Sequence, residues 1–464
     1  IEKVHQADFA VIVYNFLDML SHARTETQII RDLAEDEAAF RSLTRSWFEH
    51  SDLLLLLKLL AERGHTPAGD GETADAVIVN TCAVTAESGR KSRQALRHLM
   101  ERYPNAKSAV CGCWAQTDPD AAEALGADVV WGSGDRRGFV EAVERAVSES
   151  AHERSIDKPF ERRIIEDLPA GAFSGHARAY LKLEDGCQNF CTYCIIPYAR
   201  GRVRSLPPER AAQEAGELAA KGYRELVLTG IEIASYGEDL PGGPNLADAV
   251  VAIAEAAPEL RLRLGSLEPT VMTEDFCRRL AATGRVCAHF HLSLQSGCDA
   301  TLARMRRKYD TAEFFAVTER LRRYFPGCGL TADLITGFPG ETEADHEATL
   351  AFIEKCAFSA MHVFPYSRRP GTPADKMPGQ LTAAVKSRRA AEAHALAERM
   401  RGEYLASCVG KTLEVLFETE ENGLSTGHAS NYAEVSAPGT GLRGLVKNVQ
   451  ITGVSGQMLV GAAI

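Results

Sequence analysis

The chain has 464 residues, 45% hydrophobic and 25% charged, which is a globular balance with room for about three domains. Its formal net charge of -11 excludes a generally basic nucleic-acid-coating protein, so contact with nucleic acid would need local basic patches. Twelve cysteines do not follow the pattern of a small secreted disulfide framework. We see no signal peptide, and the apolar run at 52–60 is too short to span a bilayer. We therefore expect a cytoplasmic location without membrane contact, and a natural start upstream of Ile1.

Helical and strand-like patterns alternate from residue 53 to 147. A helical run at 53–65 is followed by strand-like runs at 74–82, 106–113 and 127–132. Between them lie helical patterns, the first of which is closed by Pro104. This alternation predicts a doubly wound parallel α/β domain over 53–147. The polar stretch 148–175 reads as a linker.

A second alternating series covers 176–408. Its six strand-like runs are 178–186, 225–231, 261–269, 289–297, 329–340 and 360–367. Six βα units predict a partial (β/α)6 barrel with its functional groups at the carboxyl ends of the strands. A long helix leads out of the series. The tail, 409–464, changes to short β runs separated by Gly, Asn and Pro, which predicts a small β-barrel.

Three cysteines stand together after the first barrel strand, at 187, 191 and 194. Thiolates are the usual ligands of iron–sulfur clusters, and three ligands on a four-iron cluster leave one iron open for catalysis. Gly186 and Pro197 suit a loop bent around such a cluster. A zinc site would need a fourth ligand, and the nearest histidine, His176, lies eleven residues upstream. The alternative, a core helix with the three cysteines on one face, is disfavoured because the flanking "DGC" and "IIP" contain Gly and Pro.

The C-x3-C-x2-C spacing of Cys187, Cys191 and Cys194 resembles the radical S-adenosylmethionine (SAM) superfamily. In that family the open iron of a 4Fe-4S cluster binds SAM. "LTG" (228–230), "SLEP" (266–269), "LQSG" (294–297) and "GFPGE" (337–341) follow in the family's order on successive strands. The resemblance implies SAM contacts at nine residues. These are Tyr193, Thr229, Gly230, Ser266, Glu268, Gln295, Gly337, Phe338 and Pro339.

A longer match, over about 60–464, is to the methylthiotransferases of that superfamily. "VNTCAVT" (79–85) and "CGCWAQ" (111–116) resemble signatures whose cysteines hold an auxiliary 4Fe-4S cluster, here Cys82 and Cys113. Cys111 has no family counterpart. We read it as a buried strand thiol, with service as a substitute ligand as the alternative.

The sequence around the first cluster loop and "LTGIEIASYGEDL" resemble the branch that acts on tRNA threonylcarbamoyladenosine. The resemblance implies insertion of a methylthio group at C2 of that adenosine beside the anticodon. The tail resembles a TRAM domain, a tRNA-binding barrel. Implied partners are tRNA, SAM, an electron donor such as flavodoxin or ferredoxin, and a sulfur source. Alternatives in the same class are isopentenyladenosine in tRNA and a ribosomal protein.

The chain departs from this family at its beginning. The family carries another cluster cysteine before the first helix, whereas this chain has no cysteine before Cys82, and its expected position falls near Arg45. Residues 15–51 resemble a stretch of the alkaline-phosphatase-like PglZ domain, too short to carry its activity. We hypothesise a fusion or a gene-model junction near 51–60 that replaces the first βα elements, so that 1–52 is foreign and the N-terminal α/β domain incomplete. A rival function is therefore an impaired iron–sulfur protein that only binds tRNA.

Two basic stretches are candidates for phosphate contact, and either could equally be a solvated face. Arg200, Arg202 and Arg204 follow the cluster loop directly, while Arg307 and Lys308 belong to the later run "ARMRRK". Tyr432 of the tail is a candidate for base stacking. His289 and His291 alternate on one strand face, and we read them as core histidines. We read six further cysteines as buried apolar side chains. These are Cys277, Cys287, Cys298, Cys328, Cys356 and Cys408.

Overall fold

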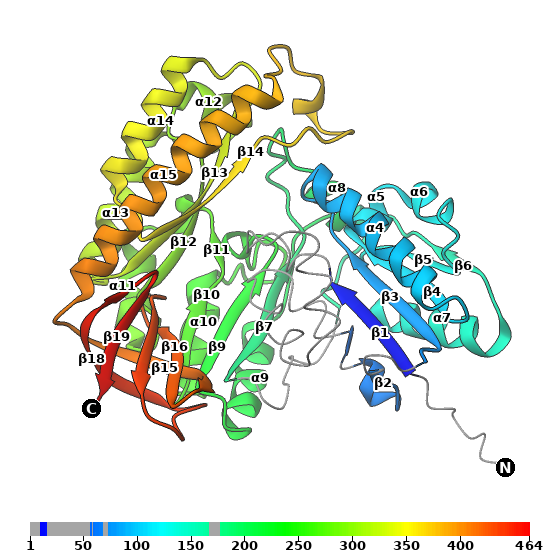
Figure 1. Cartoon of the computed structure of the whole chain (residues 1–464), viewed down its shortest axis with the longest axis horizontal. Coiled ribbons are helices and arrows are strands. Elements are labelled where there is room, and N and C mark those ends of the chain that lie inside the picture. Colours follow the sequence, from blue (N-terminus) through cyan, green and yellow to red (C-terminus); the bar gives the residue numbers. More distant parts are fainter. Residues whose placement is uncertain (1–9, 16–55, 58, 68–72, 167–176) are drawn as a thin grey trace. The chain divides into compact units, whose positions relative to one another are not determined.

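The structure, a computed structural model, describes residues 10–15, 56–57, 59–67, 73–166 and 177–464 (Figure 1). The chain forms two compact units. The first comprises 1–171, 186–189 and 194–202, and the second comprises 172–185, 190–193 and 203–464. Arg45 and the rest of 1–52 apart from 10–15 lie outside the described residues. Within the described residues, no helix is long and apolar enough to cross a membrane.

The first unit is built on a parallel sheet. Its strand order is β2 (Thr66–Pro67), β1 (Ala10–Asn15), β3 (Ala76–Thr81), β4 (Lys107–Gly112), β5 (Val129–Trp131) and β6 (Glu153–Ser155). The helices are α4 (Ala86–Arg102), α5 (Cys113–Thr117), α6 (Pro119–Glu123) and α7 (Arg136–Glu149). Strands and helices alternate along the chain, as predicted.

Two separate cores confirm the doubly wound arrangement. Ile78 and Cys111 face a core that includes Phe139 of α7. Val79 and Cys113 belong to the other core, which includes Leu96 of α4. Since successive strand residues point to opposite faces, near-continuous apolar runs are what a sheet covered on both sides needs.

The structure differs from the sequence prediction at two places in this unit. Residues 10–15, inside the segment we took as foreign, form β1, whose backbone pairs in parallel with β3. The expected incomplete sheet therefore contains a strand beside β3. Part of the predicted linker is also ordered structure: 153–155 form β6, which pairs with β5, and Pro159–Glu161 form the short helix η2. Polar sequence concealed β6 because it is an edge strand with exposed side chains.

The second unit contains the predicted partial barrel. Its first sheet has the order β10 (Arg261–Leu264), β9 (Glu225–Gly230), β7 (Arg178–Asp185) and β8 (Arg204–Ser205), with β8 antiparallel to β7. Its second sheet has the order β11 (Ser266–Leu267), β12 (His289–Gln295), β13 (Gly329–Thr336) and β14 (Ala360–Pro365). The predicted strand at 261–269 is divided at Gly265 between these two sheets.

Helices connect the barrel strands, as the sequence predicts. They are α9 (Pro208–Ala220), α10 (Leu246–Ala256), α11 (Glu274–Thr283), α12 (Asp299–Met305), α13 (Thr311–Tyr324) and α14 (Glu343–Cys356), and α15 (Ala383–Cys408) leads into the tail. The tail forms a closed barrel of β15 (Thr412–Glu421), β16 (Leu424–Ala429), β17 (Glu434–Pro438), β19 (Met458–Ala463) and β18 (Val446–Ser455).

Buried charges join the tail to the barrel strands. Glu225, fully buried, accepts hydrogen bonds from Arg261 and Arg263. The same two guanidinium groups also donate hydrogen bonds to backbone carbonyl oxygens of the tail, Arg261 to His428 (2.8 Å) and Arg263 to Ser430 (3.0 Å). The carboxylate thus compensates cations that hold two parts of the second unit together.

Candidate functional site

The three-cysteine loop lies between β7 and the short helix α8 (Ile196–Arg200). At its base, the Cys187 amide donates to the Gly201 carbonyl at 3.0 Å. Gly186 has φ +98°, and a Cβ there would lie 1.9 Å from the Arg202 carbonyl oxygen. Gly201 has φ +80° and no room for a Cβ beside Pro159. Both turns therefore require glycine, which explains the "DGC" and "ARG" ends of the motif.

Cys191 contacts a guanidinium that the sequence did not assign to it. Arg307 Nη1 donates to Cys191 Sγ at 3.2 Å and to the Tyr193 hydroxyl at 3.4 Å. Arg307 Nη2 pairs with the Glu268 carboxylate and donates to the Ser293 carbonyl. A cation beside a thiol favours the thiolate, the form that binds metal. Arg307 therefore contacts the cluster loop at Cys191, and the 4% exposure of its side chain argues against its predicted contact with RNA.

Gly230, one of the nine predicted SAM contacts, lies against a buried carboxyl group. A Cβ on Gly230 would lie 2.9 Å from Glu184 Oε2, which accepts the Glu232 amide at 2.7 Å. Glu184 is fully buried, and no donor among the described residues reaches its Oε1. Burial raises the pKa of this carboxyl. A buried carboxyl group with an unused oxygen beside Gly230 fits a cationic ligand such as an ammonium group.

Other predicted SAM residues lie within the same second unit. Ser266 and Ser293 share a hydroxyl contact of 3.2 Å, while Tyr193 and Phe338 pack edge to face with ring centroids 6.5 Å apart. Gly337, at φ +74°, donates its amide to Glu341 Oε1 at 3.0 Å. Arg389 of α15 holds that carboxylate at 2.7 Å. The "GFPGE" turn is thus fixed by an ion pair that its sequence alone did not reveal.

The remaining predicted SAM residues lie at strand ends or turns. Thr229 and Pro339 are buried, and Gln295 is buried at the end of β12 with φ +66°. Glu232 is a further acidic group near Glu268 that the sequence did not assign to the site. Burial raises its pKa to about 7, and the charge of Glu268 adds to the rise. The pKa of Glu268 is also raised by burial, against the opposing effect of Arg307.

The predicted auxiliary-cluster cysteines lie at matching strand ends of the first unit. Thr81 pairs with Gly112 at the carboxyl ends of β3 and β4, so that Cys82 and Cys113 follow in register. Both side chains are buried. Arg200 Nε donates to Cys113 Sγ at 3.2 Å. Cys111 lies in the core on the opposite face of the sheet and points its thiol to Asn80 Oδ1 at 3.7 Å, so its reading as a buried strand thiol fits its position.

The register of β1 against β3 shows which strand end could supply a third ligand to the auxiliary cluster. Asn15 of β1 pairs with Asn80 of β3, so the carboxyl end of β1 is next to that of β3. In the sequence, no cysteine lies between β1 and Cys82. The described residues therefore supply two thiolates on this face, Cys82 and Cys113, and a 4Fe-4S cluster fits them incompletely.

Most of the residues predicted to contact RNA lie in the protein interior. Arg200 and Arg204 are 7% and 3% exposed, which argues against their predicted phosphate contacts, whereas Arg202 and Lys308 are exposed. Arg204 pairs with Asp185 at 3.5 Å. Tyr432 stacks on His289 and on His428, with centroids 4.8 and 4.6 Å apart. These intramolecular stacks argue against its predicted role in stacking an RNA base.

Five of the six scattered cysteines are buried, as expected. Cys298 is the exception, since it is half-buried and its thiol donates to Asp345 Oδ1 at 3.3 Å. The two histidines of β12 share one partner, the Thr331 hydroxyl, at 3.1 Å from His289 Nε2 and 2.8 Å from His291 Nδ1. Both rings therefore lie on one face of the strand, as the alternation predicted.

Comparisons with known proteins agree with this arrangement. Residues 182–353 match the radical SAM superfamily, and residues 48–132 match the family described as uncharacterized protein family UPF0004. The solved structure of a radical SAM methyltransferase, TsrM from Kitasatospora setae, shares the fold, with a TM-score of 0.54 at 17% identity over 90% of this chain and 81% of that chain.

Curated relatives extend over most of the chain. A threonylcarbamoyladenosine tRNA methylthiotransferase from Bacillus subtilis (strain 168) is 37% identical over 399 residues, 84% of this chain and 88% of the relative. One from Thermotoga maritima is also 37% identical, over 77% of this chain and 81% of its own length. A tRNA-2-methylthio-N(6)-dimethylallyladenosine synthase from Carboxydothermus hydrogenoformans is 34% identical over 85% of this chain and 92% of its own length. With these relatives and its three-cysteine loop, the chain belongs to the radical SAM methylthiotransferase family.

Proposed function

We propose that this chain attaches a methylthio group to C2 of threonylcarbamoyladenosine in tRNA, beside the anticodon. The observation that carries the proposal is the 37% identity to two threonylcarbamoyladenosine tRNA methylthiotransferases. Cysteines 187, 191 and 194 hold one 4Fe-4S cluster with an open iron. The proposed partners are tRNA, SAM, a sulfur source and an electron donor such as flavodoxin or ferredoxin. The five-stranded tail serves as the TRAM-like tRNA-binding module.

The residues of the second unit fit the SAM-binding half of this activity. When bound, SAM and the cluster supply a carbon-centred radical, which an unreactive aromatic C–H bond requires. Glu184 offers a buried oxygen to the SAM ammonium group beside Gly230. Arg307 donates a hydrogen bond to Cys191 Sγ and forms an ion pair with the Glu268 carboxylate. Burial of these groups excludes water and strengthens each electrostatic contact.

The first unit fits the part of the activity that transfers sulfur less completely than the second unit fits SAM binding. Cys82 and Cys113 are in register at the carboxyl edge of the sheet, and Arg200 donates to Cys113. A complete auxiliary cluster with an open iron needs a third ligand that the described residues do not provide. This specific observation favours the second candidate function, an iron–sulfur protein that binds tRNA but transfers no sulfur.

Two measurements separate the two functions. Iron and sulfide are counted after anaerobic reconstitution: about eight irons per chain supports two clusters and about four supports one. Nucleosides of tRNA from a methylthiotransferase deletion strain carrying this chain are then analysed by mass spectrometry. Appearance of 2-methylthio-threonylcarbamoyladenosine supports the proposal. Four irons together with unmodified tRNA would contradict it, and a 2-methylthio-isopentenyladenosine product would assign the alternative substrate.

A further inference from the structure

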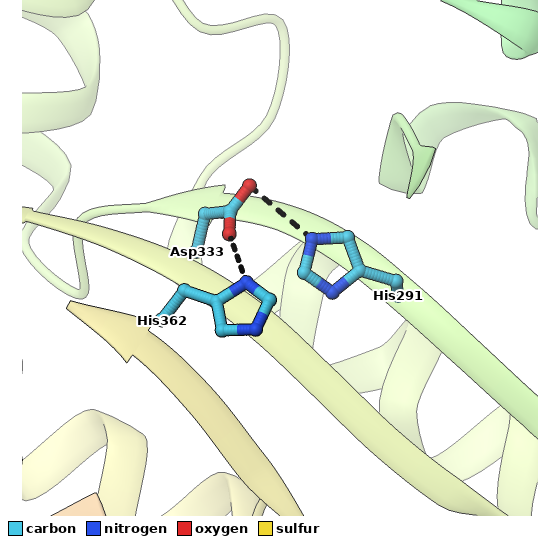
Figure 2. A group of neighbouring side chains, drawn as sticks. All are labelled: His291, Asp333 and His362. Carbon is cyan, nitrogen blue, oxygen red and sulfur yellow. Dashed lines mark hydrogen bonds and ion pairs between the residues drawn. The ribbon is translucent and has the colours of Figure 1, made fainter. Parts of the chain in front are cut away.

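Three side chains of metal-binding type meet on neighbouring strands of the second unit, and none of them is a residue predicted to hold a cluster or SAM. His291 lies on β12, Asp333 on β13 and His362 on β14, and one donor atom of each lies within 4.8 Å of the others. Figure 2 shows the Asp333 carboxylate between the two imidazole rings. We propose that these residues form a divalent metal site of the two-histidine, one-carboxylate type, with Zn²⁺ as its probe. The proposal does not depend on the proposed tRNA activity.

The distances match those between ligands of one small ion. His291 Nε2 lies 3.2 Å from Asp333 Oδ2, and His362 Nδ1 lies 3.2 Å from Asp333 Oδ1. Ligands about 2.0–2.1 Å from a tetrahedral zinc ion are separated by about 3.3 Å, which the two carboxylate–imidazole distances match. Side-chain movement has to bring the remaining donor atoms, which lie within 4.8 Å of one another, to the same separation. The two rings are also close to each other, with centroids 5.4 Å apart.

The backbone beneath the three residues is parallel sheet, with a register shift of β12 opposite Asp333. β12 pairs with β13 through His291 and Thr331, and β13 pairs with β14 through Asp333 and His362. Side chains at these positions are therefore held by hydrogen-bonded strands and do not depend on a loop. Ligands on such a frame need little ordering when a metal binds.

A hydrogen bond behind His291 fixes which of its nitrogens faces the carboxylate. His291 Nδ1 contacts the Thr331 hydroxyl at 2.8 Å, which leaves Nε2 directed to Asp333. Metal-binding histidines usually hydrogen-bond through their second nitrogen in this way. A neutral ring that binds the ion through its facing nitrogen carries its proton on the other nitrogen, which for His291 is Nδ1 next to the Thr331 hydroxyl.

Exposure leaves the site open on one side. The His291 side chain is 9% exposed, whereas Asp333 and His362 are 26% and 62% exposed. An ion can therefore enter from solvent, and three protein ligands leave a coordination position for water or another oxygen donor. This is the arrangement of an open zinc site rather than of a closed structural one.

The test uses the chain with its cluster cysteines occupied by iron. Reconstituted protein is dialysed against buffered Zn²⁺, and bound zinc is counted by elemental analysis. We expect one zinc per chain in the unchanged protein and at least a ten-fold weaker affinity in His291→Gln and Asp333→Asn. Thr331→Val should weaken binding by about 10–100-fold, since it removes the partner of His291. His394→Gln, an exposed histidine of α15, is the matched control and should bind normally.

Zinc X-ray absorption identifies the ligands of any ion that is bound. Nitrogen and oxygen neighbours at about 2.0–2.1 Å support the site, whereas sulfur neighbours at about 2.3 Å would assign the zinc to cysteines and overturn it. Zinc retention by Asp333→Asn equal to that of the unchanged chain would also overturn it. His362→Gln removes the most exposed of the three ligands and so disturbs the buried strands least. Its zinc affinity should also fall. Thermal unfolding of each variant shows whether it is folded.

Discussion

Arg200 Nε lies 3.2 Å from the sulfur of Cys113, and the Arg200 side chain is buried. The arginine therefore donates a hydrogen bond to a predicted ligand of the auxiliary cluster, although the alternating arginines around it in the sequence suggest contact with phosphates. Hydrogen bonds to ligand sulfur stabilise the thiolate and tune the potential of an iron–sulfur cluster.

Replacing Arg200 tests this contact. In Arg200→Gln we expect faster loss of auxiliary-cluster iron to a chelator and a potential lowered by tens of millivolts, because the positive donor is removed. Iron release and redox titration followed by electron paramagnetic resonance measure the two effects. Arg202→Gln, the exposed neighbour, is the control. Equal iron release from both variants would show that Arg200 does not act on the cluster.

Cys111 and Cys113 should differ in what their loss does, because they face opposite cores of the first sheet. Cys113→Ser should lower the iron content below that of the unchanged chain. Cys111→Ser should keep the iron but destabilise the fold by about 1–3 kcal/mol, since it buries a hydroxyl group among apolar side chains. Iron assays and denaturant unfolding measure the two outcomes. Loss of iron in Cys111→Ser would instead make Cys111 a substitute ligand.

Arg307 should be required for reductive SAM cleavage. It contacts Cys191, Tyr193 and Glu268, so Arg307→Gln leaves the buried Glu268 carboxylate without its cation. We expect 5'-deoxyadenosine formation to fall by about 100-fold or more. Dithionite-driven turnover with chromatographic product analysis measures this. Lys308→Gln changes the exposed basic neighbour and is the control, so it should keep full SAM cleavage. Unchanged cleavage in Arg307→Gln would show that Arg307 is not required for SAM cleavage.

Glu232 should make stability depend on pH. Burial raises its pKa to about 7, so between about pH 4.5 and 7 the folded chain binds a proton that the unfolded chain has released. The stabilisation by this proton is present at low pH and is lost as the pH rises to 7. The full loss is about 3 kcal/mol. Glu232→Gln should therefore raise the melting temperature more at pH 8 than at pH 5.5. Equal shifts at both pH values would contradict the raised pKa.

Glu225 should hold the tail barrel to the strands of the second unit. Arg261, Arg263 and Arg178 surround its buried carboxylate. Glu225→Gln removes the buried charge that the three cations share and leaves only Glu414 beside Arg261 and Glu418 beside Arg178. We expect a loss of about 3–5 kcal/mol in the free energy of unfolding. Glu414→Gln is the matched control, since Glu414 is 50% exposed and lies 3.5 Å from Arg261. A similar small loss in both variants would show that the buried cluster contributes little.

The sequence by itself determined the order of elements and the cysteine chemistry. The alternation of helical and strand-like runs predicted the parallel sheet and the six barrel strands, because burial on both faces gives each strand a short apolar run of its own. The spacing of Cys187, Cys191 and Cys194 predicted the iron–sulfur loop, since three ligands close in sequence need no distant partner. The strand division at Gly265 and the polar edge strand β6 escaped this reading, because local pattern does not specify sheet partners.

Only the tertiary structure decided which charged groups belong to the sites. Arg200 and Arg307 look in sequence like solvated phosphate binders, yet the fold buries them against Cys113 and Cys191. The His291, Asp333 and His362 cluster joins three strands separated by two helical connections, so no spacing along the chain announces it. Charge is visible in a sequence, but burial and long-range partners are not, and these two quantities decide whether a charged side chain meets solvent, a sulfur atom or a metal ion.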